Sequence, residues 1–90
     1  MGFPDFTNVL TSLTTQNAQY TATQDCWVQG IIRGDTSAAA LVYIDGFQVG
    51  GCFAENTASL SAIFFPVKAG SVISTRAQYG SYDLRVYGCA

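Results

Sequence analysis

The residues of this sequence best suited to binding are two tyrosines and an aspartate near its C-terminal end: Tyr79, Tyr82 and Asp83. A Gly-Ser pair separates the tyrosines, and this composition predicts a polar, exposed loop over residues 78–83. Tyrosine rings on such a loop can stack on a sugar or a protein epitope, while the aspartate carboxylate accepts hydrogen bonds from it. Ordinary packing within the loop is the alternative. We therefore take these three residues as the candidate binding residues.

The residue types that most enzymes use for catalysis are scarce. The chain contains no histidine, which excludes Ser-His-Asp and Cys-His catalytic arrangements and any imidazole metal ligand. The acidic residues from Asp25 onward fall in predicted turns, where a carboxylate accepts hydrogen bonds from the backbone. We expect a protein that is not an enzyme and that uses no cofactor and no metal.

The three cysteines, Cys26, Cys52 and Cys89, are too few and too widely spaced for a disulfide framework or a zinc site. They are interpreted as small buried apolar residues. The alternative is a single Cys26–Cys89 disulfide, which requires the first and last core strands to be neighbours and leaves Cys52 free.

Composition predicts one small domain whose surface is poor in charge. The 90 residues are 49% hydrophobic and only 11% charged, against roughly 25% charged in an average globular domain. The net charge is −2 and the basic residues are scattered singly, so no patch for nucleic acid exists. The longest apolar run, over residues 38–44, is far shorter than the roughly 18 residues that indicate a membrane span, so we expect no membrane insertion.

A β-hairpin around Asp45 and Gly46 is the firmest element that the sequence predicts. The runs over residues 39–44 and 47–49 are rich in β-branched and aromatic residues, and an Asp-Gly pair readily adopts the positive φ values of a type I′ turn. The chain is therefore expected to be built from hairpins.

Other short strands follow at intervals of roughly 8–12 residues, a spacing typical of a β-sandwich or barrel. In the strand over residues 26–33, Trp27 and Ile31 share one face, while Val28 and Ile32 share the other with Cys26. Pro66 marks an edge strand or a strand end. Further strands are predicted over residues 59–65, 71–77 and 84–89, and a weak one over 9–13. We expect an extended lead-in over residues 1–17 and a β-sandwich domain over 18–90.

Several of these strands carry apolar residues on both faces, although no segment could form a helix to cover the second face. This pattern favours packing of the second face against other copies of the same chain.

Five short motifs occur in an order that resembles the C-terminal head domains of bacteriophage tail-fibre and receptor-binding proteins. They are Tyr20-Thr21-Ala22, Cys26-Trp27-Val28 with Gly30, residues 42–49 (VYIDGFQV), residues 65–72 (FPVKAGSV) and Leu84-Arg85-Val86-Tyr87. The sequence departs from the family pattern at residues 23–26, where the usual proline-and-glycine turn is replaced. It also departs at Asp45, where Asn is common.

The resemblance implies an all-β, jelly-roll-like β-sandwich that assembles as a homotrimer at the tip of a viral tail fibre, outside the cell. It also implies attachment to a host cell-surface receptor, often a saccharide, through exposed loops such as the one that carries Tyr79, Tyr82 and Asp83. One alternative is a structural trimerisation or virion decoration module with no receptor of its own. Another is a trimeric signalling ligand of the complement-globular or tumour-necrosis type, although those domains are generally longer.

Overall fold

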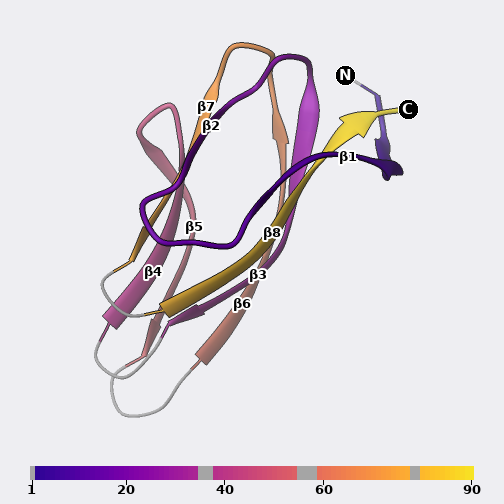
Figure 1. Ribbon diagram of the computed structural model, residues 1–90. Helices are drawn as coiled ribbons and strands as arrows, with labels where there is room; N and C mark the ends of the chain where they lie inside the picture. The colour runs from indigo at the N-terminus through magenta and orange to yellow at the C-terminus, as the bar shows by residue number, and fades with distance from the viewer. Residues whose placement is uncertain (1, 35–37, 55–58, 78–79) are drawn as a thin grey trace.

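The chain folds into two antiparallel β-sheets that pack face to face (Figure 1). The computed structural model describes residues 2–34, 38–54, 59–77 and 80–90. These residues form β1 (Pro4–Leu13), β2 (Gln19–Thr21), β3 (Cys26–Gly34), β4 (Ala38–Ile44), β5 (Phe47–Ala54), β6 (Ser59–Val67), β7 (Val72–Ala77) and β8 (Gly80–Cys89). The first sheet has the strand order β1-β8-β3-β6 and the second sheet has the order β2-β7-β4-β5. Eight strands interleaved in this way between two four-stranded sheets form a jelly roll, which confirms the predicted all-β, jelly-roll-like sandwich.

The hairpin between β4 and β5 has the predicted turn. Asp45 and Gly46 both have positive φ, at 52° and 82°, as a type I′ turn requires. Asp45 also joins this turn to the start of β7: its amide donates to the Val72 carbonyl at 2.9 Å, and its Oδ1 accepts from the Val72 amide at 2.8 Å. Hydrogen bonds from Val72 and from the Ser71 side chain hold the pKa of Asp45 below its usual value. The acceptor role explains why an aspartate serves at this position.

The hydrophobic core lies between the sheets and is built from alternate residues of each strand. Cys26, Val28 and Ile32 of β3 are fully buried, whereas Ile31 is 50% exposed on the other side of the strand, as the alternation predicts. Burying each large aliphatic side chain of this core contributes about 1.5–3 kcal/mol. The largest fully buried side chains are Ile32, Ile73, Leu84, Val28, Val42, Val67 and Val86.

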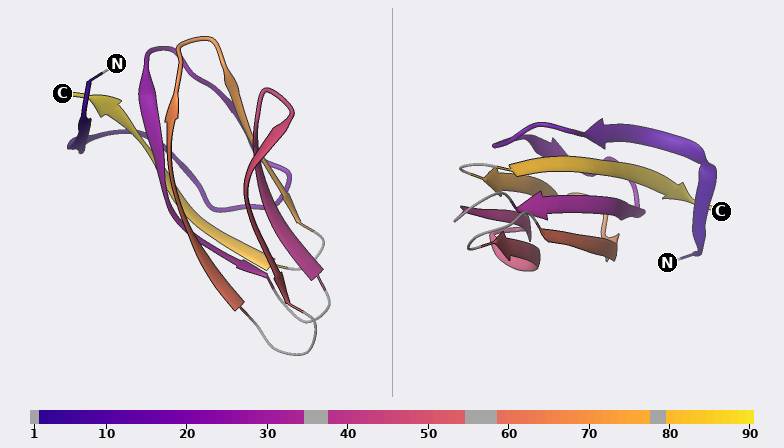
Figure 2. Two further views of the ribbon diagram at one scale, coloured as in Figure 1. Left: turned by 180° about the vertical axis from the view of Figure 1, so that it is seen from behind. Right: turned by 90° about the horizontal axis from the view of Figure 1, so that it is seen from below.

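The N-terminal segment belongs to the first sheet. The sequence predicts only a weak strand over residues 9–13, but β1 runs from Pro4 to Leu13 and pairs with β8, with shifts of register on either side of Val9. The Ala90 amide donates to the Phe3 carbonyl at 2.8 Å, so the two ends of the described chain lie together (Figures 1 and 2). The backbone of β8 supplies this pairing, which side-chain periodicity alone does not indicate.

The position of Pro66 agrees with the prediction of an edge strand. Pro66 lies in β6, opposite Trp27 of β3, and β6 is the last strand of the first sheet. Because β6 has a neighbour on one side only, a residue without an amide hydrogen is tolerated there.

None of the three cysteines forms a disulfide. The first and last core strands are neighbours, as a Cys26–Cys89 disulfide requires, but the residue opposite Cys26 on β8 is Gly88. Cys26 faces the core and Cys89 is one residue further along the strand, where its thiol donates to the Asp25 carbonyl at 3.4 Å. Burial raises the pKa of the Cys26 thiol, and the nearby Cys89 and Asp25 raise it further. Cys26 and Cys52 are buried, as expected, but Cys89 is only half-buried and forms a hydrogen bond, so the interpretation as a buried apolar residue is wrong for Cys89.

Candidate functional site

Tyr82 is a buried residue of β8 and does not lie on an exposed loop, so that prediction is wrong. Its side chain is 4% exposed, and it lies opposite Ile32 in the ladder between β8 and β3. That ladder starts at Gly34 and Gly80, so the backbone of β3 holds the Gly-Ser-Tyr segment extended even though its composition is typical of a loop. Tyr82 cannot contact a partner in this position.

The hydroxyl of Tyr82 links the two sheets. Its oxygen lies 3.0 Å from the Leu41 amide, which donates to it, and 2.9 Å and 2.6 Å from the carbonyl oxygens of Leu41 and Arg76. A hydroxyl has one hydrogen, which it donates to one of these two carbonyls at a time. Burial raises the pKa of Tyr82 because the phenolate form is poorly solvated there. Tyr82 is therefore a structural residue that joins β8 to β4 and β7.

The structure does not bring the three predicted binding residues together. Tyr79 lies outside the described residues. Asp83 follows Tyr82 on β8 and is exposed on the opposite face of the strand, beside Ile31 of β3. Of the predicted site, only the carboxylate of Asp83 is described as accessible.

The outer side of the first sheet carries an exposed apolar surface. Phe6 packs edge-on against Tyr87, with ring centroids 5.0 Å apart, and the rings of Trp27 and Phe64 lie 4.9 Å apart. Phe6 and Phe64 are still 58% and 54% exposed, and Leu60 is 61% exposed. Val9 and Ile31 are exposed on the same side, whereas Trp27 is half-buried and Tyr87 is covered. We call this set of residues the outer apolar face: Phe6, Val9, Trp27, Ile31, Leu60, Phe64 and Tyr87.

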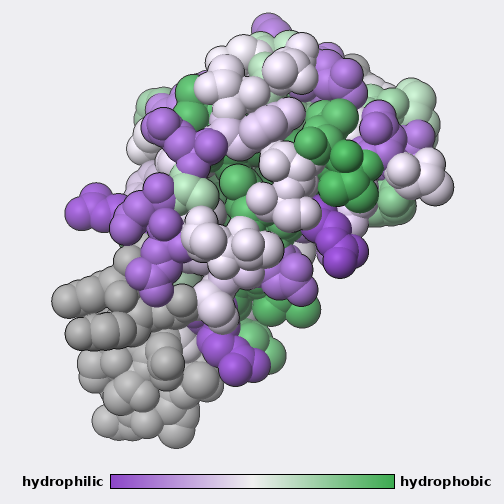
Figure 3. Space-filling view, in the orientation of Figure 1, coloured by the Kyte–Doolittle hydropathy of each residue, from purple (hydrophilic) through white to green (hydrophobic). Residues whose placement is uncertain are grey.

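Hydrophobic patches in the space-filling view gather on the side where the first sheet lies (Figure 3). The sequence predicts this surface in part, since Trp27 and Ile31 were expected to share a face. Large exposed apolar patches mark interaction sites in many proteins.

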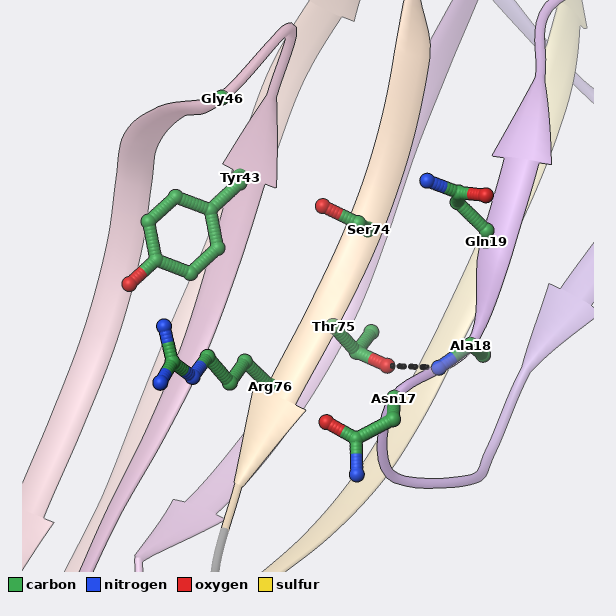
Figure 4. A pocket seen from close by; sticks show the side chains of 8 residues that line it. All are labelled: Asn17, Ala18, Gln19, Tyr43, Gly46, Ser74, Thr75 and Arg76. Atoms are coloured by element: carbon green, nitrogen blue, oxygen red, sulfur yellow. Dashed lines mark hydrogen bonds between the residues drawn. The ribbon is translucent and has the colours of Figure 1, made fainter.

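The outer side of the second sheet holds an open hollow of about 490 Å³ whose lining surface is mixed, polar and apolar in similar parts. We call it the polar trough after the polar side chains that line it. Ser74 of β7 forms its floor. The register of the strands places Ser74 between Gln19 of β2 on one side and Tyr43 of β4 on the other. The small Ser74 side chain leaves a depression between two larger neighbours (Figure 4). The lining residues are Asn17, Ala18, Gln19, Tyr43, Gly46, Ser74, Thr75 and Arg76.

Thr75 fixes the end of the polar trough that Asn17 and Ala18 form. The Thr75 side chain is 3% exposed, and its Oγ1 accepts a hydrogen bond from the Ala18 amide at 2.9 Å and donates one to the Thr15 carbonyl at 2.8 Å. The Thr75 amide also donates to the Ala18 carbonyl at 3.0 Å. These bonds hold Asn17 at a φ of 55°, a left-handed conformation that Asn tolerates well.

The residues of the polar trough were not singled out from the sequence. They come from three strands and two connections that are far apart in the chain, and no motif unites them. Tyr43 belongs to the motif over residues 42–49, but there it indicates only a hairpin strand. Strand order and register, which bring these residues together, carry no local signal.

No protein-family model, curated protein or solved structure matches this chain. Within the described residues, no group of three or more His, Cys, Asp and Glu side chains could hold a metal ion. In the same part of the chain, no helix is long and apolar enough to cross a membrane.

Tyr82→Phe should destabilise the fold by about 1–3 kcal/mol, because it leaves the Leu41 amide and the carbonyls of Leu41 and Arg76 without the hydroxyl. Urea unfolding followed by circular dichroism measures the loss. Tyr43→Phe removes the same atom from an outward-facing ring and should change stability by no more than about 0.5 kcal/mol. Equal stability of the two variants would contradict the linking role of Tyr82.

Thr75→Val should increase hydrogen exchange of the Ala18 amide, because valine keeps the shape of threonine but accepts no hydrogen bond. We expect a loss of global stability of about 1–3 kcal/mol as well. Native-state hydrogen exchange followed by NMR measures both effects, with Thr75→Ser as the control that retains the hydroxyl. If the Ala18 amide stayed as protected in Thr75→Val as in Thr75→Ser, the hydroxyl would not hold this segment.

Proposed function

We propose that the chain is the non-enzymatic head domain of a bacteriophage tail-fibre or receptor-binding protein, which assembles as a homotrimer and attaches to a host surface receptor. The observation that carries the proposal is the outer apolar face, which a single sandwich leaves exposed. The order of the sequence motifs and the jelly-roll strand order support the same conclusion.

A second copy of the chain is the partner that best fits the outer apolar face. Ile31, near its middle, is 50% exposed, and its cross-strand neighbour on β8 is Asp83. Arg33 and Arg85 lie two residues away from this pair on the same side of the sheet. A surface with both signs of charge around an apolar centre can form complementary contacts with a rotated copy of itself. A ring of three copies then closes without leaving apolar surface free.

Assembly through the first sheet leaves the polar outer side of the second sheet available for attachment. One observation favours the alternative, a trimerisation or virion decoration module with no receptor: Tyr82, which the sequence places among the receptor-contacting residues, is buried. Both functions use the same fold and the same assembly, and they differ only in whether the head binds cells.

Ile31→Lys should convert a trimer into a folded monomer. A lysine ammonium cannot be buried in an apolar interface without a large cost, whereas in the monomer it remains in solvent beside Asp83. Sedimentation velocity at micromolar concentration measures the mass, and circular dichroism checks the fold. The control is Phe47→Lys, because Phe47 is 77% exposed at the β4–β5 turn and away from the first sheet. A monomeric wild-type chain would refute the proposed assembly.

A fluorescently labelled wild-type trimer should bind saturably to the surface of at least one strain in a panel of bacteria. Unlabelled trimer should compete for that binding. Flow cytometry measures both, with Ile31→Lys as the monovalent control, which should bind more weakly because avidity is lost. A trimer that labels no strain would favour the decoration module.

A further inference from the structure

Among the described residues that line the polar trough, Arg76 is the one charged side chain, and it is exposed. An exposed guanidinium can bind an anionic group of a ligand, and its planar set of donors matches a carboxylate. A single cation is too little for a nucleic-acid backbone, which needs several phosphate contacts.

The other walls suit a ligand that is rich in hydroxyl groups. Asn17 and Gln19 each offer an amide that can donate and accept, and the Ser74 hydroxyl does both at the floor. The half-buried ring of Tyr43 lies in the same hollow as the Arg76 guanidinium, with the two amides on the other side of β7 (Figure 4). An aromatic ring with a polar tip can stack on the apolar face of a sugar and hydrogen-bond to its rim.

Both ends of the polar trough are held in place before any ligand binds. Thr75 fixes residues 15–18 at one end, and the bonds between Asp45 and Val72 fix the turn that carries Gly46 at the other. A site whose walls are already ordered loses less conformational entropy on binding. Its volume of about 490 Å³ falls within the range of about 300–1,000 Å³ that is typical of small-molecule sites.

We infer that the polar trough binds an acidic saccharide, whose carboxylate pairs with Arg76, whose ring stacks on Tyr43 and whose hydroxyls bond to Asn17, Gln19 and Ser74. This inference rests on the proposed attachment function and names the chemistry of the receptor: a glycan that carries uronic or other sugar carboxylates. The sequence indicated a receptor site near Asp83, which lies on the first sheet. The site inferred here lies instead on the outer side of the second sheet.

The test is an NMR titration of the ¹⁵N-labelled chain with methyl β-D-glucuronide and methyl β-D-glucoside, which differ only in the carboxylate. The glucuronide should shift the amide signals of residues 17–19, 43–46 and 74–76. The glucoside should bind about tenfold more weakly or worse, because the charge-assisted hydrogen bonds are lost. Sodium acetate and a glutamate-containing tripeptide, each titrated alone, should bind more weakly than the glucuronide.

Three variants assign the roles. Arg76→Gln should weaken glucuronide binding about tenfold and remove the preference over the glucoside. Lys68→Gln deletes an equal charge from an exposed position just after β6, outside both the polar trough and the outer apolar face, and should leave the titration unchanged. Ser74→Leu fills the floor of the polar trough and should abolish binding of both sugars.

The inference is overturned if neither sugar shifts these signals, if Arg76→Gln retains the preference, or if acetate or the tripeptide binds as well as the glucuronide. Such a result with a chain that still trimerises and adsorbs to cells overturns the saccharide site alone. Glucuronide binding by a chain that stays monomeric and labels no cells overturns the proposed function and leaves the saccharide site standing.

Discussion

A two-layer β-sandwich can bury only one face of each sheet, and this constraint governs the whole molecule. The second sheet has an apolar inner side and an outer side that carries the polar residues Gln19, Ser74 and Arg76. The first sheet has apolar residues on both sides: Val28 and Ile32 point into the core, while Ile31 and Phe64 are exposed on the outer side. The part of the chain that the structure describes contains no helix that could cover that side. The two outer surfaces therefore differ in chemistry, and the two proposals follow that difference: self-association through the first sheet and recognition by the second.

Strand β7 contributes both to the stability of the fold and to the candidate site. The Thr75 side chain points inward and fixes the connection before β2, and the Arg76 carbonyl lies within hydrogen-bonding distance of the Tyr82 hydroxyl from the opposite sheet. The side chains of Ser74 and Arg76 point the other way and line the polar trough. Within the described residues, no buried side-chain nitrogen or oxygen atom lacks a hydrogen-bond partner, so every buried hydroxyl there forms a hydrogen bond. The interactions that hold β7 thus also set the shape of the trough.

The sequence predicts those parts of the fold that local chemistry determines. The Asp45-Gly46 turn follows from the φ preferences of two residues, and the two faces of β3 follow from strict alternation. Tyr82 could not be placed correctly because a Gly-Ser-Tyr segment reads as a loop, while the ladder with β3 that extends it involves residues almost fifty positions away. The polar trough could not be predicted for the same reason, since the row from Gln19 through Ser74 to Tyr43 exists only once β7 lies between β2 and β4.

The accessibility of Trp27 tests most directly the claim that the outer apolar face is covered by other copies of the chain. Trp27 is the single tryptophan, lies on that face and is four residues from Ile31 along β3. Acrylamide quenching of its fluorescence can be compared between the wild-type chain and Ile31→Lys at equal micromolar concentrations. If other copies cover this face, quenching should be weak in the wild type and strong in the variant. Equal quenching of the two proteins would contradict that claim.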